Sequence, residues 1–276
     1  MTPEYDYIRT LVKRSSAMVL EDGKEYLIQA RLAPLVRQEG VPTIEHLVAR
    51  MRERPDSPLH SRVVEAMTIN ETSFFRDINP FEVLRKHVLP ALQQARAHNR
   101  TLNIWSAACS TGQEPYSLAM VLRDLFPDLV TWRVRIYATD LCSQVLEKAK
   151  RGKYTQLEVN RGLPAPMLIK NFVQDGTEWA VKPEVRGLVE FRQMNLSAPW
   201  QGLPPMDVVL MRNVLIYFDV ETKKRLLGYL KDVLRPDGYL FLGAAETTFN
   251  IDGSFEAIEQ SRTIYYRRAQ AAKERS

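Results

Sequence analysis

The chain has 276 residues and a mass of 31.8 kDa, and its 45% hydrophobic and 26% charged residues exclude a disordered or fibrous protein. The net charge of +5 does not indicate a nucleic-acid partner, because the last fifteen residues alone hold 5 basic residues against 1 acidic residue. With no apolar run of roughly 18 residues, no signal peptide and only Cys109 and Cys142, we expect a cytoplasmic protein without membrane insertion, disulfide framework or metal site.

The first seventy residues show helical periodicity only. Ile44, Leu47, Val48 and Met51 recur at i, i+3, i+4 and i+7 after Thr43, which predicts an amphipathic helix with Thr43 as its cap. Further helices are predicted around Ile8–Val12, over 23–39 with a possible kink at Pro34, and around Val63–Met67. We therefore predict a small all-helical domain over residues 1–68, followed by a linker over 69–80.

Strands and helices alternate from Leu102 onward, which predicts a parallel, doubly wound α/β sheet. The predicted strands are Leu102–Ser106, Val134–Thr139, Val189–Gln193, Asp207–Met211, Tyr239–Gly243 and Thr263–Arg267. The predicted helices are Tyr116–Phe126, Ser143–Arg151 and Val220–Leu234, the last of them followed by a turn at Pro236–Gly238. The irregular segment Tyr154–Gly187 interrupts this alternation and is interpreted as an inserted loop or small subdomain.

Three predicted strands end in small or polar residues. The first is followed by the loop Ala107–Gly112, the second ends at Asp140, and Arg212-Asn213 follows a third. The Asp140 carboxylate suits both hydroxyls of a ribose or the N-cap of the next helix, and both interpretations remain open. Ligands of open α/β sheets bind at the carboxyl ends of strands, and the phosphate-binding loop patterns are absent here. The three ends together favour S-adenosylmethionine as the cofactor.

The linker contains an unusual segment, Asn70–Arg76, in which two aromatic residues are flanked by hydrogen-bonding ones. A structural interpretation is that Phe74 and Phe75 join the helical unit to the α/β unit. A functional interpretation is that the linker folds over a cleft and supplies residues to a site.

Four segments resemble the CheR family, the chemotaxis-receptor methyltransferases: Asn70–Arg76, Trp105–Ser117, Ala138–Asp140 and Arg212–Phe218. The resemblance extends from about Tyr5 to Arg267. It implies a Rossmann-like class I methyltransferase domain over 81–276, with a β-subdomain inserted at about 154–187. It also implies methyl transfer from S-adenosylmethionine to receptor glutamates, with S-adenosylhomocysteine as the other product.

The resemblance carries over site residues by position. Glu114 and Asp140 suit the amino end of the methionine and the ribose, in either assignment, and Asn195-Leu196 would bracket the adenine. Arg76 and Tyr217 would line the methyl-transfer site. The implied cofactor contacts are Asn70, Thr72, Arg76, Glu114, Asp140, Asn195, Leu196, Arg212 and Asn213.

The resemblance also implies a receptor-docking surface, with Arg31 and Arg37 at the positions of the docking residues. The alternative is that both belong to an ordinary solvated helix face. Some family members grip a receptor pentapeptide with a β-subdomain whose turn is long and glycine-rich. Segment 174–179 of this chain is shorter and has one glycine, so we expect independence of the pentapeptide. Segment Gly243–Glu246 departs from the Gly-His-Ser-Glu that is common in the family.

Two other functions are compatible with these features. One is a methyltransferase of the same fold that acts on a small molecule or RNA, and the other is a non-catalytic scaffold. The linker motif and the helical domain favour the receptor enzyme, which we expect to be a monomer recruited to membrane receptor arrays.

Overall fold

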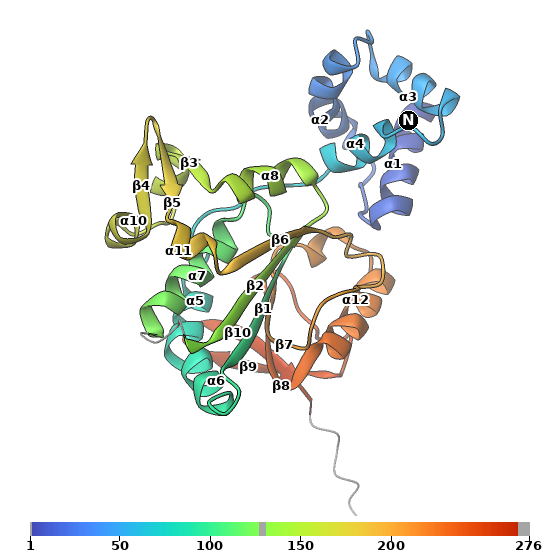
Figure 1. Cartoon of the computed structure of the whole chain (residues 1–276). Coiled ribbons are helices and arrows are strands. Elements are labelled where there is room, and N and C mark those ends of the chain that lie inside the picture. Colours follow the sequence, from blue (N-terminus) through green and yellow to red (C-terminus); the bar gives the residue numbers. More distant parts are fainter. Residues whose placement is uncertain (1, 127–130, 270–276) are drawn as a thin grey trace, which may run out of the picture.

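Residues 2–126 and 131–269 are described by the computed structural model of the protein (Figure 1). The last seven residues, 270–276, lie outside the described residues. The first part of the chain is helical, as predicted, and α2 continues through Pro34. Its helices are α1 (Pro3–Ser16), α2 (Glu25–Gln38), α3 (Ile44–Glu53) and α4 (Leu59–Ala66). Their apolar faces form one core, in which Ile8, Leu32, Leu47 and Met51 are fully buried.

A seven-stranded sheet in the order β6-β2-β1-β7-β8-β10-β9 forms the second part of the molecule. The first five strands of this order are parallel, and β10 is antiparallel to both of its neighbours. The predicted doubly wound α/β sheet is therefore confirmed. The strands are β1 (Thr101–Ala107), β2 (Arg133–Asp140), β6 (Val189–Gln193), β7 (Met206–Met211), β8 (Leu234–Leu242), β9 (Phe255–Gln260) and β10 (Thr263–Arg268).

Two details of the sheet differ from the prediction. Strand β9 lies at the sheet edge and only Phe255 in it is buried, so it lacks the apolar pattern of the other strands. The predicted turn at Pro236–Gly238 lies within β8, where the register with β7 shifts from Met206–Leu234 to Val208–Tyr239. The chain remains paired on both sides of this irregularity.

The central strands are buried on both faces because helices cover both sides of the sheet. Val208 and Leu210 of β7 pack on the side of α7, whereas Val209 and Met211 pack on the side of α12. Figure 1 shows α7 and α12 on opposite sides of the sheet. The surrounding helices are α5 (Asn79–Val83), η1 (Leu84–Val88), α6 (Leu89–Ala95), α7 (Gln113–Leu125), α8 (Ser143–Arg151) and α12 (Val220–Val233). None of the described helices is long and apolar enough to cross a bilayer.

A buried charge network fastens the amino-terminal ends of the central strands. Asp207 is fully buried and accepts hydrogen bonds from Arg96 Nε at 2.7 Å and from the backbone N–H of Asn103 at 2.8 Å. Arg96 also forms a bidentate pair with Asp237 of β8. This network ties α6 to β1, β7 and β8 at the end of the sheet opposite the polar strand ends.

An inserted subdomain follows α8 and contains a three-stranded antiparallel sheet in the order β3-β5-β4. The linker is attached to this subdomain through Phe74, whose ring makes edge contacts with Tyr154 and Phe172 at centroid distances of 5.0 and 5.6 Å. Phe75 packs on Phe81 of α5. The interpretation that these two rings join the helical unit to the sheet is wrong. The subdomain consists of β3 (Lys153–Thr155), α9 (Gln156–Asn160), α10 (Ala165–Asn171), β4 (Phe172–Asp175), β5 (Glu178–Val181) and α11 (Pro183–Arg186).

The helical unit contacts the α/β unit through its loop after α1 and through α4. Met18 forms an isolated antiparallel bridge with Phe218, next to the short helix η3 (Leu215–Tyr217). The Glu65 carboxylate of α4 accepts hydrogen bonds from the backbone N–H and the hydroxyl of Ser143, at the start of α8. Both contacts lie beside the carboxyl ends of the parallel strands.

Candidate active site

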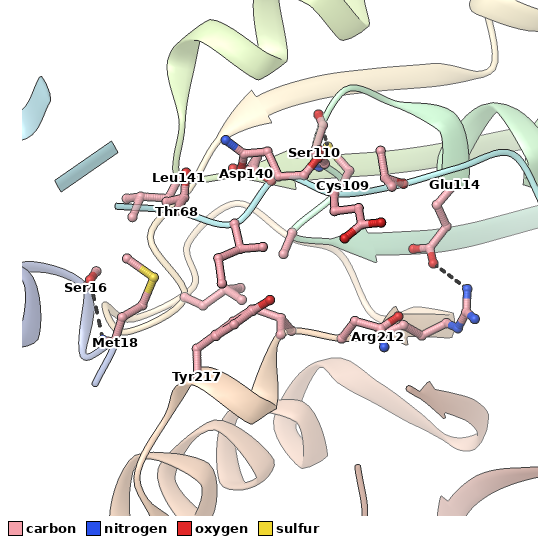
Figure 2. Close-up of a pocket in the computed structure, with 18 of the residues that line it drawn as sticks. Ser16, Met18, Thr68, Cys109, Ser110, Glu114, Asp140, Leu141, Arg212 and Tyr217 are labelled. Carbon is pink, nitrogen blue, oxygen red and sulfur yellow. Dashed lines mark hydrogen bonds and ion pairs between the residues drawn. The ribbon is translucent and has the colours of Figure 1, made fainter. Parts of the chain in front are cut away.

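A cavity of about 880 Å³, including its open mouth, lies at the carboxyl ends of β1, β2, β6 and β7 (Figure 2). β1 is paired with β2 on one side and with β7 on the other, so the cavity lies where the strand order reverses. The structure brings all the residues that the sequence assigns to cofactor binding and methyl transfer into the lining of this one cavity. They are Asn70, Thr72, Arg76, Glu114, Asp140, Asn195, Leu196, Arg212, Asn213 and Tyr217.

The backbone around the cavity is unusual. Ala108, Ser110 and Asn213 line it and have left-handed φ angles of 56°, 52° and 57°. Such conformations cost of order 1–3 kcal/mol each in residues other than glycine and are concentrated at functional sites. Gly112 begins α7 with a φ of 93°, and a Cβ atom there would lie 2.9 Å from Ala149 Cβ. The loop after β1 is thus held in one tight conformation beside the cavity.

Glu114 and Arg212 form the polar wall at the α7 end of the cavity. Glu114 accepts hydrogen bonds from Ser106 Oγ at 2.7 Å and from Arg212 Nη1 at 2.9 Å, and Figure 2 shows the second of these contacts. The Arg212 side chain is only 2% exposed, and its Nη2 atom donates to the Arg76 carbonyl and to Asp77 of the linker. Its Nε atom is buried and has no hydrogen-bond partner among the described residues. Arg212 therefore connects β7, α7 and the linker and leaves one donor unpaired.

Asp140 is buried at the end of β2. Its two carboxylate oxygens accept hydrogen bonds from the backbone N–H groups of Ser110 at 2.8 Å and Cys142 at 2.9 Å. The N-cap of α8 is Cys142 and not Asp140, so the N-cap interpretation of Asp140 is wrong. Burial raises the pKa of Asp140, and the backbone hydrogen bonds oppose that shift. The carboxylate is oriented by the backbone and lines the cavity.

Asn195 follows β6 and links the cavity to the helical unit. Its side-chain amide donates to the Ser15 carbonyl at 2.6 Å, and its Oδ1 atom accepts from the backbone N–H and hydroxyl of Ser197. The side chain is thus engaged with the protein on both ends. The neighbouring Leu196 belongs, with Leu141 and Met194, to the apolar part of the lining.

The sequence did not indicate that the helical unit contributes to the cavity. Ser16 and Met18 line it, and the backbone N–H of Val19 donates to the Tyr217 carbonyl at 2.9 Å. In Figure 2, Ser16 and Met18 enter from one side and Tyr217 lies beneath the cavity. No local pattern predicts this contact, because it joins segments that are roughly two hundred residues apart in the chain.

The two predicted docking residues lie outside this cavity. Arg31 of α2 lines a second, adjoining cavity, which shares Met18, Ile69 and Tyr217 with the first. Its Nη1 atom donates to the Met67 carbonyl at 2.6 Å. Arg37 is exposed near the end of α2.

Burial raises the pKa of the Tyr217 hydroxyl, whereas the positive charges of Arg76 and Arg31 act to lower it.

The donors and acceptors of the cavity fit S-adenosylmethionine. Two carboxylates, Glu114 and Asp140, suit its ammonium group and its ribose hydroxyls. The unpaired Nε of Arg212 is a buried donor that a carboxylate or carbonyl of a ligand would satisfy. Apolar side chains around Leu196 suit a flat aromatic base.

Fold and cavity together define a Rossmann-like class I methyltransferase that uses S-adenosylmethionine. The comparison with protein families agrees with this class: the model of the CheR methyltransferase SAM-binding domain matches residues 70–264, and that of the CheR methyltransferase all-alpha domain matches residues 3–68. The chain belongs to the CheR methyltransferase family.

Three curated relatives cover almost the whole chain. It is 42% identical to chemotaxis protein methyltransferase 1 of Pseudomonas aeruginosa, over 96% of this chain and 97% of the relative. It is 38% identical to chemotaxis protein methyltransferase Cher2 of Pseudomonas putida, over 95% and 97%. It is 36% identical to the chemotaxis protein methyltransferase of Vibrio parahaemolyticus, over 96% of both chains. The predicted family and cofactor are thereby confirmed.

We predict that Asp140→Asn weakens binding of S-adenosylhomocysteine by roughly 10- to 100-fold, because the amide retains one acceptor oxygen and loses the charge. Isothermal titration calorimetry measures this change directly. Asp56→Asn, an exposed substitution in the helical unit, is the control and should leave the affinity unchanged. Equal affinity of the Asp140 variant and the wild type would contradict a role of Asp140 in binding.

The raised pKa of Asp140 also gives the direction of a pH effect on binding. Protonation removes the charge and an acceptor, so affinity should fall as the pH is lowered through a range above the ordinary Asp value. The Asp140→Asn variant should lack this part of the pH dependence. The same calorimetric titration repeated across pH distinguishes the two proteins.

Proposed function

We propose that this methyltransferase converts glutamate side chains on the cytoplasmic helices of chemoreceptors into glutamyl methyl esters, as part of sensory adaptation. The observation that carries this proposal is the position of Tyr217 between two arginines. Arg76 lines the cofactor cavity on one side, and Arg31 of the helical unit lines the adjoining cavity on the other. The charges of Arg76 and Arg31 act on Tyr217 in the direction that favours an approaching carboxylate, against the opposing charges of Glu246 and Glu71. The names of the curated relatives support chemotaxis as the process.

The chemistry of the proposed acceptor makes few demands on the protein. A glutamate with a pKa of about 4.3 is already ionised at neutral pH, so no general base is required. S-adenosylmethionine supplies the methyl group when it is bound. The task of the protein is then to align the carboxylate and to exclude water.

Arg76 and Tyr217 are the residues that we assign to this alignment. Arg76 Nη1 donates to the Glu71 carbonyl at 3.1 Å, which leaves other guanidinium N–H groups for the carboxylate oxygen that does not attack. The Tyr217 hydroxyl reaches the same region and is suited to orient the carboxylate or the methyl donor.

The helical unit, with Arg31 and Arg37 on α2, is proposed to dock on the acidic face of the receptor helix. We further propose that a receptor pentapeptide is not required. Asp175 of β4 pairs with Glu178 of β5, so only Gly176 and Thr177 form the turn of the subdomain hairpin. The resemblance links peptide binding to a longer, glycine-rich turn, so this short turn supports the proposal.

One chain supplies all the site residues named above, which supports action as a monomer. The location that we propose follows from the acceptor: the enzyme would work in the cytoplasm, recruited to receptor arrays.

The defining experiment is transfer of a labelled methyl group from S-adenosylmethionine to a panel of receptor cytoplasmic fragments. We expect label that mild alkali releases as methanol, because esters are hydrolysed and N-methyl groups are not. Arg76→Ala should abolish this transfer. Arg133→Ala, an exposed arginine at the start of β2 and so at the end of the sheet opposite the cavity, is the matched control and should retain it.

The outcomes of this assay separate the competing functions. Alkali-stable label would indicate another acceptor group. Cofactor binding without transfer to any fragment would indicate a different acceptor or a scaffold. Near-normal turnover of the Arg76 variant would remove Arg76 from the methyl-transfer site.

Charge reversal tests the docking surface. Arg31→Glu and Arg37→Glu should raise the apparent KM for the receptor fragment and leave the affinity for S-adenosylhomocysteine unchanged. Because Arg31 also bonds the Met67 carbonyl, Arg37→Glu is the variant that isolates the charge effect. Arg54→Glu, exposed at the end of α3, is the control. Unaltered receptor kinetics in both variants would exclude this surface.

Calorimetry with receptor C-terminal pentapeptides tests independence of the tether. We expect no heat of binding at micromolar concentrations, and equal methylation rates for receptor fragments with and without the pentapeptide. Micromolar binding would contradict the proposal.

A further inference from the structure

Glu246, in the loop between β8 and β9, binds four backbone N–H groups through one carboxylate. Its Oε2 atom accepts from Asn213 at 2.7 Å and from Gly243 at 2.6 Å. Its Oε1 atom accepts from Val214 at 2.8 Å and from Ile216 at 3.2 Å. Backbone N–H groups that converge in this way form an anion-binding concavity, and here the protein supplies the anion itself.

The surrounding backbone is shaped for this carboxylate. Asn213, whose N–H donates to Glu246, has a left-handed φ of 57°. A Cβ atom at Gly243 would lie 2.7 Å from Glu246 Oε2 and 2.8 Å from the Asn213 nitrogen. Any other residue at position 243 would therefore displace the carboxylate or the segment that it holds.

The segment held by Glu246 carries residues of the cofactor cavity. Asn213 lies within it and Tyr217 ends it, and both line the cavity. Glu246 lies behind this segment, where it lines a different cavity together with Asp77 and Glu259. Glu246 is therefore placed to influence the reaction through the backbone between β7 and η3, and its charge also acts to raise the pKa of the Tyr217 hydroxyl.

We propose that Glu246 is a positioning residue for methyl transfer. Its carboxylate fixes the path of residues 213–216 and thereby sets the place of Asn213 and Tyr217 in the cavity. Because the loss of geometry by about 1 Å costs up to 100-fold in rate, a displaced Tyr217 should be visible in kcat. The activity part of this inference rests on the proposed function.

Glu246→Gln is the decisive substitution. In the wild type, each oxygen of the Glu246 carboxylate accepts hydrogen bonds from two backbone N–H groups. The glutamine amide has only one oxygen, and its NH₂ group is a donor. In either orientation of the amide, two backbone N–H groups would face another donor. Glu259→Gln, an exposed glutamate at the same neighbouring cavity, is the matched control.

Hydrogen exchange and kinetics are measured on the full chain. We expect faster exchange of the Asn213, Val214 and Ile216 amides in Glu246→Gln, with the sheet amides unchanged. We express kcat per binding-competent site, counted by titration with S-adenosylhomocysteine. This kcat should fall roughly 10- to 100-fold, while the KM for the receptor fragment stays unchanged. In a Tyr217→Phe background the same substitution should lower kcat much less, because the two residues act together. The Glu259 variant should behave as the wild type.

A lower melting temperature with unchanged kcat per binding site would overturn the proposal and leave Glu246 a purely stabilising residue. An equal fall of kcat in the Tyr217→Phe background would overturn the route through Tyr217. If Glu246→Gln does not fold, Glu246→Asp keeps the charge on a shorter side chain and should give intermediate values. If the wild type methylates no receptor fragment, the proposed function fails. Hydrogen exchange then still tests whether Glu246 fixes the path of residues 213–216.

Discussion

The buried Arg212 guanidinium is the contact on which the rest of the site depends. It is a charged group with almost no exposure, and it is stable there only because Glu114, Asp77 and the Arg76 carbonyl surround it. Through these partners it joins the end of β7 to the start of α7 and to the linker. Removing one partner from a buried charge costs about 3–5 kcal/mol, so the three segments cannot easily separate. The linker residue Arg76 thus occupies its place because Arg212, which follows β7 more than a hundred positions away in the chain, binds its backbone carbonyl.

The helical unit completes this site rather than standing beside it. The bridge between Met18 and Phe218 and the hydrogen bond from Asn195 to the Ser15 carbonyl place the loop after α1 against the cavity. A receptor helix docked on α2 would therefore lie against the same unit that closes the cofactor cavity. In our proposal, substrate binding and cofactor enclosure are linked by these backbone contacts, and Tyr217 stands at their boundary.

Sequence patterns predicted the elements that have strong hydrophobic periodicity, and the family resemblance assembled the site residues. Sequence patterns failed where an element depends on partners that are distant in the chain. In strand β9 the apolar residues Phe255, Ala257 and Ile258 do not alternate regularly with polar ones, so it has no clear pattern to detect. Phe74 could be recognised as buried, but its partners Tyr154 and Phe172 lie in the inserted subdomain and are not evident from spacing. In the sequence, Glu246 was noted only within a segment that departs from the family pattern. Its role could not be predicted, because its partners are backbone N–H groups and not side chains with a recognisable pattern.

Glu114 and Asp140, two of the acidic residues that line the cavity, are stabilised in different ways, and this difference bears on how a ligand is held. Glu114 has a cationic partner in Arg212, so its charge is compensated before any ligand arrives. Asp140 is held by backbone N–H groups of Ser110 and Cys142, which orient it but compensate burial only in part, and its pKa is raised accordingly. A neutral hydroxyl donor adds a further hydrogen bond to such a carboxylate without bringing another charge into the cavity. We therefore propose that Asp140 is the partner of the ribose diol, and that Glu114 takes the amino group of the methionine, because the unpaired Nε atom of the neighbouring Arg212 suits the methionine carboxylate.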